Sequence, residues 1–164
     1  MKEKICSFFG QNNLLITDEL YAVTSAEIMH TIALGCRVFY FSGKGAFDGL
    51  CYQIVTKIRT EYPCLGIKRV LCAPKESPYP KTKQYFYRKY YDEIAYLPPN
   101  LESDTENINE NAYTIIKSSD FVVFYMEKGA SAEYNAYEYA QKRKKRVINL
   151  CTKINSLNDA KDRA

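Results

Sequence analysis

Apolar residues fall into short clusters along the chain, separated by longer segments that mix apolar and polar positions. The clusters are rich in β-branched and aromatic residues, which is typical of strands. We predict strands over Ile5–Phe9, Val38–Phe41, Ile67–Ala73, Ile94–Leu97, Phe121–Met126 and Val147–Leu150. The intervening segments repeat their apolar positions with a helical period. We predict helices over Asp18–Leu34, Phe47–Tyr62, Thr82–Tyr91, Thr105–Lys117 and Ser131–Lys145.

The predicted strands and helices alternate strictly. Because neighbouring parallel strands need a crossover connection, this alternation indicates an α/β protein with a mostly parallel sheet between two layers of helices. The almost continuous apolar runs "VFYF" and "VVFYM" agree with strands that are buried on both faces. Residues 77–100 contain four prolines and six tyrosines, so they form either a helix and a strand or an irregular excursion.

Length and composition are those of one ordinary domain, with 164 residues of which 46% are hydrophobic. We expect a single domain over residues 1–151 and a polar C-terminal tail over residues 152–164. The formal net charge of +4 permits an anionic ligand but is too small to predict nucleic-acid binding. The chain lacks an apolar run of membrane-spanning length and a signal-peptide pattern, so we expect a cytoplasmic protein without membrane contact.

Six cysteines are scattered along the chain, without a CxxC pair and with a single histidine, His30. This distribution argues against both a disulfide framework and a structural zinc site. We expect reduced thiols, and neither a bound metal nor a cofactor.

Glycine-bearing loops follow three of the predicted strands. In open α/β sheets, ligands bind beyond the carboxyl ends of the strands, where the strand order reverses. This rule selects as candidate ligand-binding residues Gly10, Gln11 and Asn12, then Ser42, Gly43, Lys44 and Gly45, and finally Gly129, Ala130 and Ser131.

The second of these loops has two interpretations. Gly43 and Gly45 let the backbone approach a ligand closely, the next helix offers unpaired N–H groups to an anion, and Lys44 adds a positive charge. Glycine-rich turns between a strand and a helix are also common structural devices. The spacing matches neither of the established nucleotide-binding glycine motifs, so both interpretations stay open.

Two carboxylates near these loops are candidate catalytic residues. Asp48 lies in the first turn of the second helix, where it either faces a ligand or stabilises the helix end. Glu133 lies in the first turn of the fifth helix, behind Ser131, which is also a possible N-cap. A carboxylate beside a bound sugar can act as nucleophile or general base at the anomeric carbon.

A tyrosine-rich stretch, "YPKTKQYFYRKYYDEIAY", interleaves aromatic and basic residues. Such residues can stack nucleobases, but they more often pack a helix against a sheet or a partner subunit. We expect packing or self-association rather than nucleic-acid binding.

Three segments resemble the YpsA-like branch of the SLOG superfamily, which is related to the lysine decarboxylase-like proteins. They are "CSFFGQN", "FSGKGAFDGLC" and "SSDFVVFY" followed by "AYEYA". The resemblance implies a Rossmann-like three-layer sandwich of strand order 3-2-1-4-5-6, a nucleotide or nucleotide-derived ligand over the loops named above, and homo-oligomers. It implies a sensor or effector domain, without a defined reaction.

The sequence also departs from that family. Gly10-Gln11-Asn12 stands where the family has Gly-His-Arg, and Asn111-Ala112 where it has Arg-Asn, so the guanidinium groups best suited to phosphate are missing. The segment "GASAEYNAYEYA" resembles instead the Gly-x-x-x-Glu loop of nucleoside 2-deoxyribosyltransferases. That second resemblance implies an alternative function, an N-glycosidic hydrolase or transferase with Glu133 as nucleophile.

Overall fold

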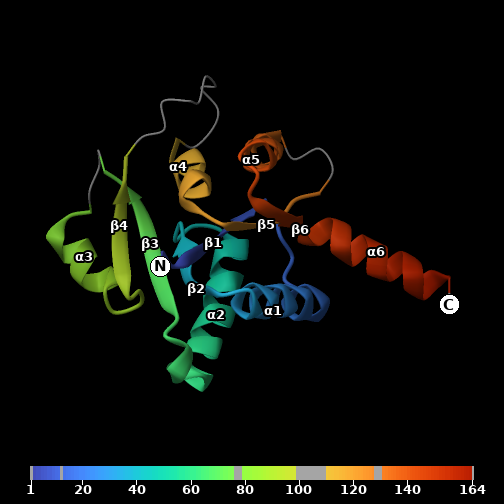
Figure 1. Ribbon diagram of the computed structural model, residues 1–164, viewed down its shortest axis with the longest axis horizontal. Coiled ribbons are helices and arrows are strands. Elements are labelled where there is room, and N and C mark those ends of the chain that lie inside the picture. Colours follow the sequence, from blue (N-terminus) through green and yellow to red (C-terminus); the bar gives the residue numbers. More distant parts are fainter. Residues whose placement is uncertain (1, 12, 76–78, 99–109, 128–130, 164) are drawn as a thin grey trace.

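A computed structural model describes residues 2–11, 13–75, 79–98, 110–127 and 131–163. Within these residues the strands form one six-stranded sheet, in which every pair of neighbours is parallel (Figure 1). The strands are β1 (Lys4–Gly10), β2 (Cys36–Phe41), β3 (Lys68–Pro74), β4 (Glu93–Leu97), β5 (Phe121–Tyr125) and β6 (Arg146–Asn149). The helices are α1 (Asp18–Ala33), α2 (Ala46–Glu61), α3 (Lys81–Tyr87), α4 (Glu110–Ser118), α5 (Ser131–Lys142) and α6 (Leu150–Asp162), with a short 3-10 turn, η1 (Pro63–Leu65).

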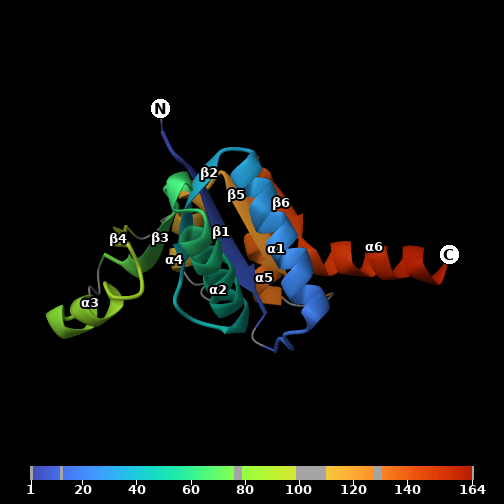
Figure 2. The ribbon, with the colours of Figure 1, turned by 90° about the horizontal axis from the view of Figure 1, so that it is seen from below.

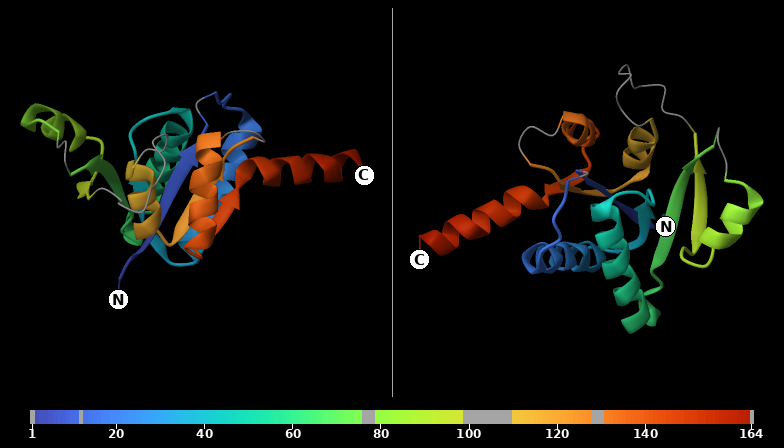
Figure 3. Two further views of the ribbon diagram at one scale, coloured as in Figure 1. Left: turned by 90° about the horizontal axis from the view of Figure 1, so that it is seen from above. Right: turned by 180° about the vertical axis from the view of Figure 1, so that it is seen from behind.

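The helices lie in two layers on opposite faces of the sheet. Helices α1 and α2 cover one face, and α4 and α5 cover the other (Figure 1; Figure 3, right). Helix α3 lies outside the sheet beside β4. The predicted class, a Rossmann-like three-layer α/β sandwich, is confirmed.

The strand order differs from the predicted 3-2-1-4-5-6 at one place. The observed order is β4-β3-β2-β1-β5-β6, because β4 pairs with β3 and not with β1. The tyrosine-rich excursion contains the seven-residue helix α3, which connects β3 to β4. This crossover places β4 directly beside β3, at the outer edge of the sheet. The order of strands therefore reverses between β1 and β5, which are paired.

The main hydrophobic core lies between the sheet and helices α1 and α2. Its centre is a group of phenylalanines in which Phe8 contacts the rings of Phe39, Phe41 and Phe47 at centroid distances of 6.1, 5.5 and 6.4 Å. Burying each of these rings contributes roughly 1.5–3 kcal/mol to the free energy of folding. The core thus joins the first two strands to the start of α2.

Helix α6 covers most of the expected polar C-terminal tail. Asn149 caps this helix, because its Oδ1 accepts a hydrogen bond from the N–H of Cys151 at 3.1 Å. Leu150 is fully buried and Ile154 packs on the main core, so the first turns are anchored. The rest of α6 points away from the body of the protein (Figure 2). None of the described helices is long and apolar enough to cross a membrane.

Candidate functional site

The candidate site lies at the edge of the sheet where the strands have their carboxyl ends. We call it the carboxyl-edge site. It consists of Gly10 and Gln11 at the end of β1, residues 42–45 after β2, Glu127 after β5 and the start of α5 at Ser131. All of these segments are on one edge because every strand is parallel. The reversal of strand order between β1 and β5 falls at this edge, as expected for a ligand site of an open α/β sheet.

The loops after β1 and β5 are held together by Gln11. Its backbone N–H donates to the carbonyl of Tyr125 at 3.1 Å, and its side-chain Oε1 accepts from the N–H of Glu127 at 2.7 Å. The side-chain Nε2 donates to the carbonyl of Asn13 at 3.1 Å. The backbone N–H and the side-chain Oε1 of Gln11 therefore join the two loops, while its Nε2 braces the loop after β1. This is a structural role that its prediction as a ligand-binding residue did not include.

Gly10 lies directly against α2. A Cβ atom added at Gly10 would come within 2.4 Å of the Cβ of Phe47. Phe47 is only 1% exposed, and its ring also contacts Tyr125 at a centroid distance of 6.2 Å. Phe47 thus fills the space between the ends of β1 and β5 and the start of α2.

The loop between β2 and α2 requires glycine at two positions. Gly43 and Gly45 have φ values of +76° and +93°, in a region that other residues rarely adopt. A Cβ at Gly43 would also lie 2.9 Å from Cδ1 of Leu71. The tight turn brings Ser42 and Gly43 back over the first turn of α2.

Asp48 fastens this loop to the helix. Its Oδ1 accepts hydrogen bonds from the N–H of Ser42 at 2.8 Å and from the Ser42 hydroxyl at 3.2 Å, and its Oδ2 accepts from the N–H of Gly43 at 3.0 Å. Asp48 is 7% exposed. Of the two open interpretations, these contacts favour the structural one for this carboxylate. They also occupy the backbone amides of Ser42 and Gly43, two of the predicted ligand-binding residues.

The electrostatics of Asp48 reflect its burial. Burial raises the pKa of Asp48 to about 6, while the hydrogen bonds from Ser42 and Gly43 act to lower it. Burial, and to a lesser extent the negative charge of Asp48, raises the pKa of the thiols of Cys51 and Cys72. The hydrogen bonds of this carboxylate hold the geometry of the loop, and its predicted catalytic role stays a prediction.

The donors that remain near the loop are at the start of α2. Gly45 is the N-cap residue and no side chain caps the helix there. The N–H groups of a first helical turn have no partner within their own helix and carry a partial positive charge. Lys44 is exposed, next to this helix end. Lys44 and the amides of the first turn are thus the remaining candidate donors of the predicted anion cradle.

Several predicted site residues lie outside the described residues. These are Asn12, Gly129 and Ala130. Ser131 and Glu133 belong to α5, but the positions of their side chains are not described. The pairing of Glu133 with Asp48 as catalytic residues therefore stays a prediction.

The structure adds Tyr91 to the site. It belongs to the tyrosine-rich excursion, which packs as predicted: the ring of Tyr91 lies against Phe41 and Tyr52 at centroid distances of 6.1 and 5.1 Å. Its hydroxyl oxygen lies 3.9 Å from the position that a Cβ would take on Gly43. No local sequence signal places Tyr91 there, because it follows a different strand from the loop that it approaches.

Two cavities lined by described residues lie away from the carboxyl edge. One, of about 370 Å³, lies between α1 and strands β5 and β6, where Glu27 pairs with Lys153 at 3.3 Å. The other, of about 330 Å³, lies beside the first residues of β1, β3 and β4. Among the described residues no group of three or more histidine, cysteine or acidic side chains is arranged to hold a metal ion.

No protein-family model matches the sequence, and neither does any curated protein. Solved structures do resemble the fold. A Moco carrier protein from Chlamydomonas reinhardtii has a TM-score of 0.54 at 14% sequence identity, over 96% of this chain and 86% of that chain. A structure of the molybdenum cofactor carrier protein from the same organism has a TM-score of 0.51 at 16% identity, over 89% and 75%. These similarities show a shared Rossmann-like fold.

Proposed function

We propose that the protein binds a small anionic molecule, a nucleotide or a nucleotide-derived compound, at the carboxyl-edge site and acts as a sensor or effector domain of the SLOG type. The observation that carries this proposal is the convergence of the loops after β1, β2 and β5 at the point where the strand order reverses. The hydrogen bond from Glu127 to Gln11 supports a site assembled from segments that are distant in the sequence.

The chemistry of the loop supports an anionic ligand. Asp48 uses its carboxylate on the loop itself, so its charge is partly balanced by the amides of Ser42 and Gly43. A phosphate would bind at the start of α2, where backbone N–H groups and Lys44 are the donors. Backbone amides at a helix start replace, in this proposal, the arginines that the family has and this chain lacks.

The shared fold is compatible with a binding role. The two Chlamydomonas proteins are named for carrying a molybdenum cofactor. Their low identity to this chain supports no conclusion about its ligand, so the nucleotide-like ligand follows from the resemblance and from the chemistry of the loop. The proposal also includes the expected cytoplasmic location and self-association, the second of which light scattering measures directly.

A thermal-shift titration tests the proposal. AMP, ADP, ATP, NAD and inorganic phosphate are added separately to the purified chain. A ligand at 100 times its dissociation constant stabilises the folded state by about 2.7 kcal/mol, which corresponds to a rise of roughly 5–10 °C in the melting temperature of a domain of this size. If none of these compounds changes the melting temperature at millimolar concentration, the proposal is wrong.

A matched pair of lysine variants locates the site. Lys44→Ala should weaken binding about fivefold, because a charge pair at about 4 Å in water is worth about 1 kcal/mol. Lys57→Ala is the control, since Lys57 lies near the far end of α2, the helix that follows Lys44. Its side chain is 63% exposed and pairs only weakly with Glu61 at 4.0 Å. Equal affinities of the two variants would place the ligand elsewhere.

A further inference from the structure

Tyr91 presents an unused hydrogen-bond donor to the carboxyl-edge site. Its hydroxyl oxygen is 3.9 Å from the place of a Cβ on Gly43. Among the described residues this hydroxyl has no hydrogen-bond partner. It is also accessible, because among the described residues the buried side-chain polar atom without a partner is Tyr96 Oη and not the Tyr91 hydroxyl. The donor is therefore available to a molecule bound beside the loop.

The ring of Tyr91 is held in a fixed position by other aromatic rings. Its centroid lies 5.1 Å from that of Tyr52, 6.1 Å from that of Phe41 and 6.4 Å from that of Tyr87. These neighbours come from α2, β2 and α3. The position of the hydroxyl oxygen is thus defined before a ligand binds, which lowers the entropy cost of forming a hydrogen bond to the ligand.

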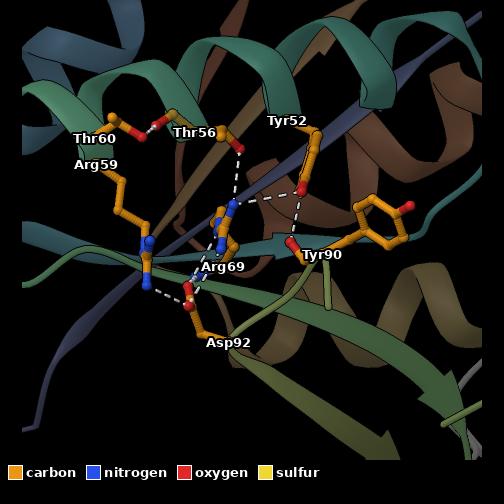
Figure 4. Close-up of polar contacts among 7 residues, drawn as sticks. All are labelled: Tyr52, Thr56, Arg59, Thr60, Arg69, Tyr90 and Asp92. Atoms are coloured by element: carbon orange, nitrogen blue, oxygen red, sulfur yellow. Dashed lines mark hydrogen bonds and ion pairs between the residues drawn. The ribbon is translucent and has the colours of Figure 1, made fainter. Parts of the chain in front are cut away.

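The residue after Tyr91 is clamped to α2 and β3. Asp92 accepts hydrogen bonds from the backbone N–H of Arg69 at 2.8 Å and from its Nε at 3.1 Å, and from Nη2 of Arg59 at 2.7 Å (Figure 4). Arg69 in turn donates to the hydroxyl of Thr56 at 3.2 Å. We call these residues the Arg69–Asp92 clamp.

The residue before Tyr91 is held to the same helix. The hydroxyl of Tyr52 donates to the carbonyl of Tyr90 at 2.6 Å (Figure 4). Tyr91 therefore lies between two backbone positions that are both tied to α2, the helix whose first turn belongs to the proposed site. These contacts hold the backbone on both sides of Tyr91 against α2.

We propose that Tyr91 is a ligand-contacting residue, whose hydroxyl donates a hydrogen bond to the anionic group bound at Lys44 and the start of α2, and that the Arg69–Asp92 clamp positions it. This inference rests on the proposed function. The hydroxyl stays protonated at physiological pH, because burial and then the negative charge of Asp48 raise the pKa of Tyr91. A neutral O–H group is suited to this place, since a second negative charge beside Asp48 would repel the ligand.

The first test removes only the hydroxyl. Tyr91→Phe keeps the ring and its packing, so its melting temperature should stay within about 2 °C of the wild type. Its affinity for ADP, measured by isothermal titration calorimetry, should fall about 10-fold or more, the usual effect of losing a hydrogen bond to a charged group. Tyr85→Phe is the matched control, because Tyr85 is 70% exposed on α3, and its affinity should be unchanged.

The second test loosens the clamp. Asp92→Asn should weaken ADP binding at a temperature well below the melting point of this variant. In a double-mutant cycle, Tyr91→Phe should weaken binding less in the Asp92→Asn protein than in the wild type. If the wild type binds ADP and Tyr91→Phe binds it equally well, the inference is overturned and the proposed function stands. If the wild type binds one of AMP, ATP or NAD and not ADP, the same comparison is made with that ligand. If the wild type binds none of these compounds and no inorganic phosphate, both are overturned.

Discussion

Replacing Gly10 by alanine tests the close approach of β1 to α2, which sets the geometry of the carboxyl edge. A Cβ on Gly10 would lie 2.4 Å from Cβ, 2.7 Å from Cγ and 2.9 Å from Cδ2 of Phe47. The shortest of these distances falls about 1 Å short of ordinary contact, and Phe47 is 1% exposed, so it cannot turn into solvent. The helix or the strand must therefore move.

The magnitude follows from the cost of overpacking, which is typically 1–3 kcal/mol. Because the blocking atom is a Cβ, fixed to the backbone, we expect Gly10→Ala to lower the free energy of unfolding by about 3 kcal/mol. Substitutions of Gly45 and Gly49 separate this steric effect from the effect of backbone conformation. Gly45 has no atom within 4 Å of its Cβ position but a φ of +93°, so Gly45→Ala should cost roughly 1–3 kcal/mol through strain alone.

Gly49→Ala is the control, because it introduces neither a steric clash nor backbone strain. Gly49 lies inside α2, and no atom lies within 4 Å of its Cβ position. This change should raise the free energy of unfolding by about 0.5–1 kcal/mol, the usual gain in a helix interior. Urea unfolding followed by far-UV circular dichroism measures all three variants. A Gly10→Ala protein within about 0.5 kcal/mol of the wild type would refute the close packing described for Gly10 and Phe47.

Three further predictions follow from the same contacts. The pKa of Asp48 is raised to about 6 in the folded protein, so its contribution to stability is greatest at acid pH and is lost as pH rises through about 6. The free energy of unfolding of the wild type minus that of Asp48→Asn should therefore rise by about 1 kcal/mol from pH 7 to pH 5; a constant difference would contradict this. Tyr96→Phe removes a buried hydroxyl that has no hydrogen-bond partner among the described residues, and should leave stability unchanged or raise it by up to about 1 kcal/mol in urea unfolding. Tyr52→Phe loses its hydrogen bond to Tyr90 and should cost about 1 kcal/mol. A binding protein should release no free base from nucleosides, as measured by chromatography, and release that Glu133→Gln abolishes would establish the glycosidase alternative instead.

The sequence predicts the layers of this fold well because they depend on local patterns. The continuous apolar runs at Val38–Phe41 and Phe121–Met126 correspond to β2 and β5, which are buried on both faces. Helix α6 was not predicted, because its sequence is polar. Its stability comes from tertiary contacts of Leu150 and Ile154 and from the Asn149 cap, and a hydrophobic pattern does not reveal these.

The site was harder to predict because its contacts join distant parts of the chain. The sequence identifies which residues end each strand, but the partner of Gln11 is the backbone of Glu127, which no local motif indicates. The strand order was wrong for the fourth strand for the same reason, since pairing between β3 and β4 depends on how far the α3 crossover reaches. Tyr91 was missed because only the folded sheet brings it to Gly43.

An NMR titration of the isotope-labelled chain with ADP tests the central claim most directly, because it reports on each backbone amide. The account predicts saturable shifts concentrated in the amides of residues 43–47 at the start of α2, with smaller shifts at Gly10 and Tyr91. Shifts that gather instead around Glu27 and Lys153, beside the cavity between α1 and β6, or no shifts at millimolar ADP, would contradict it.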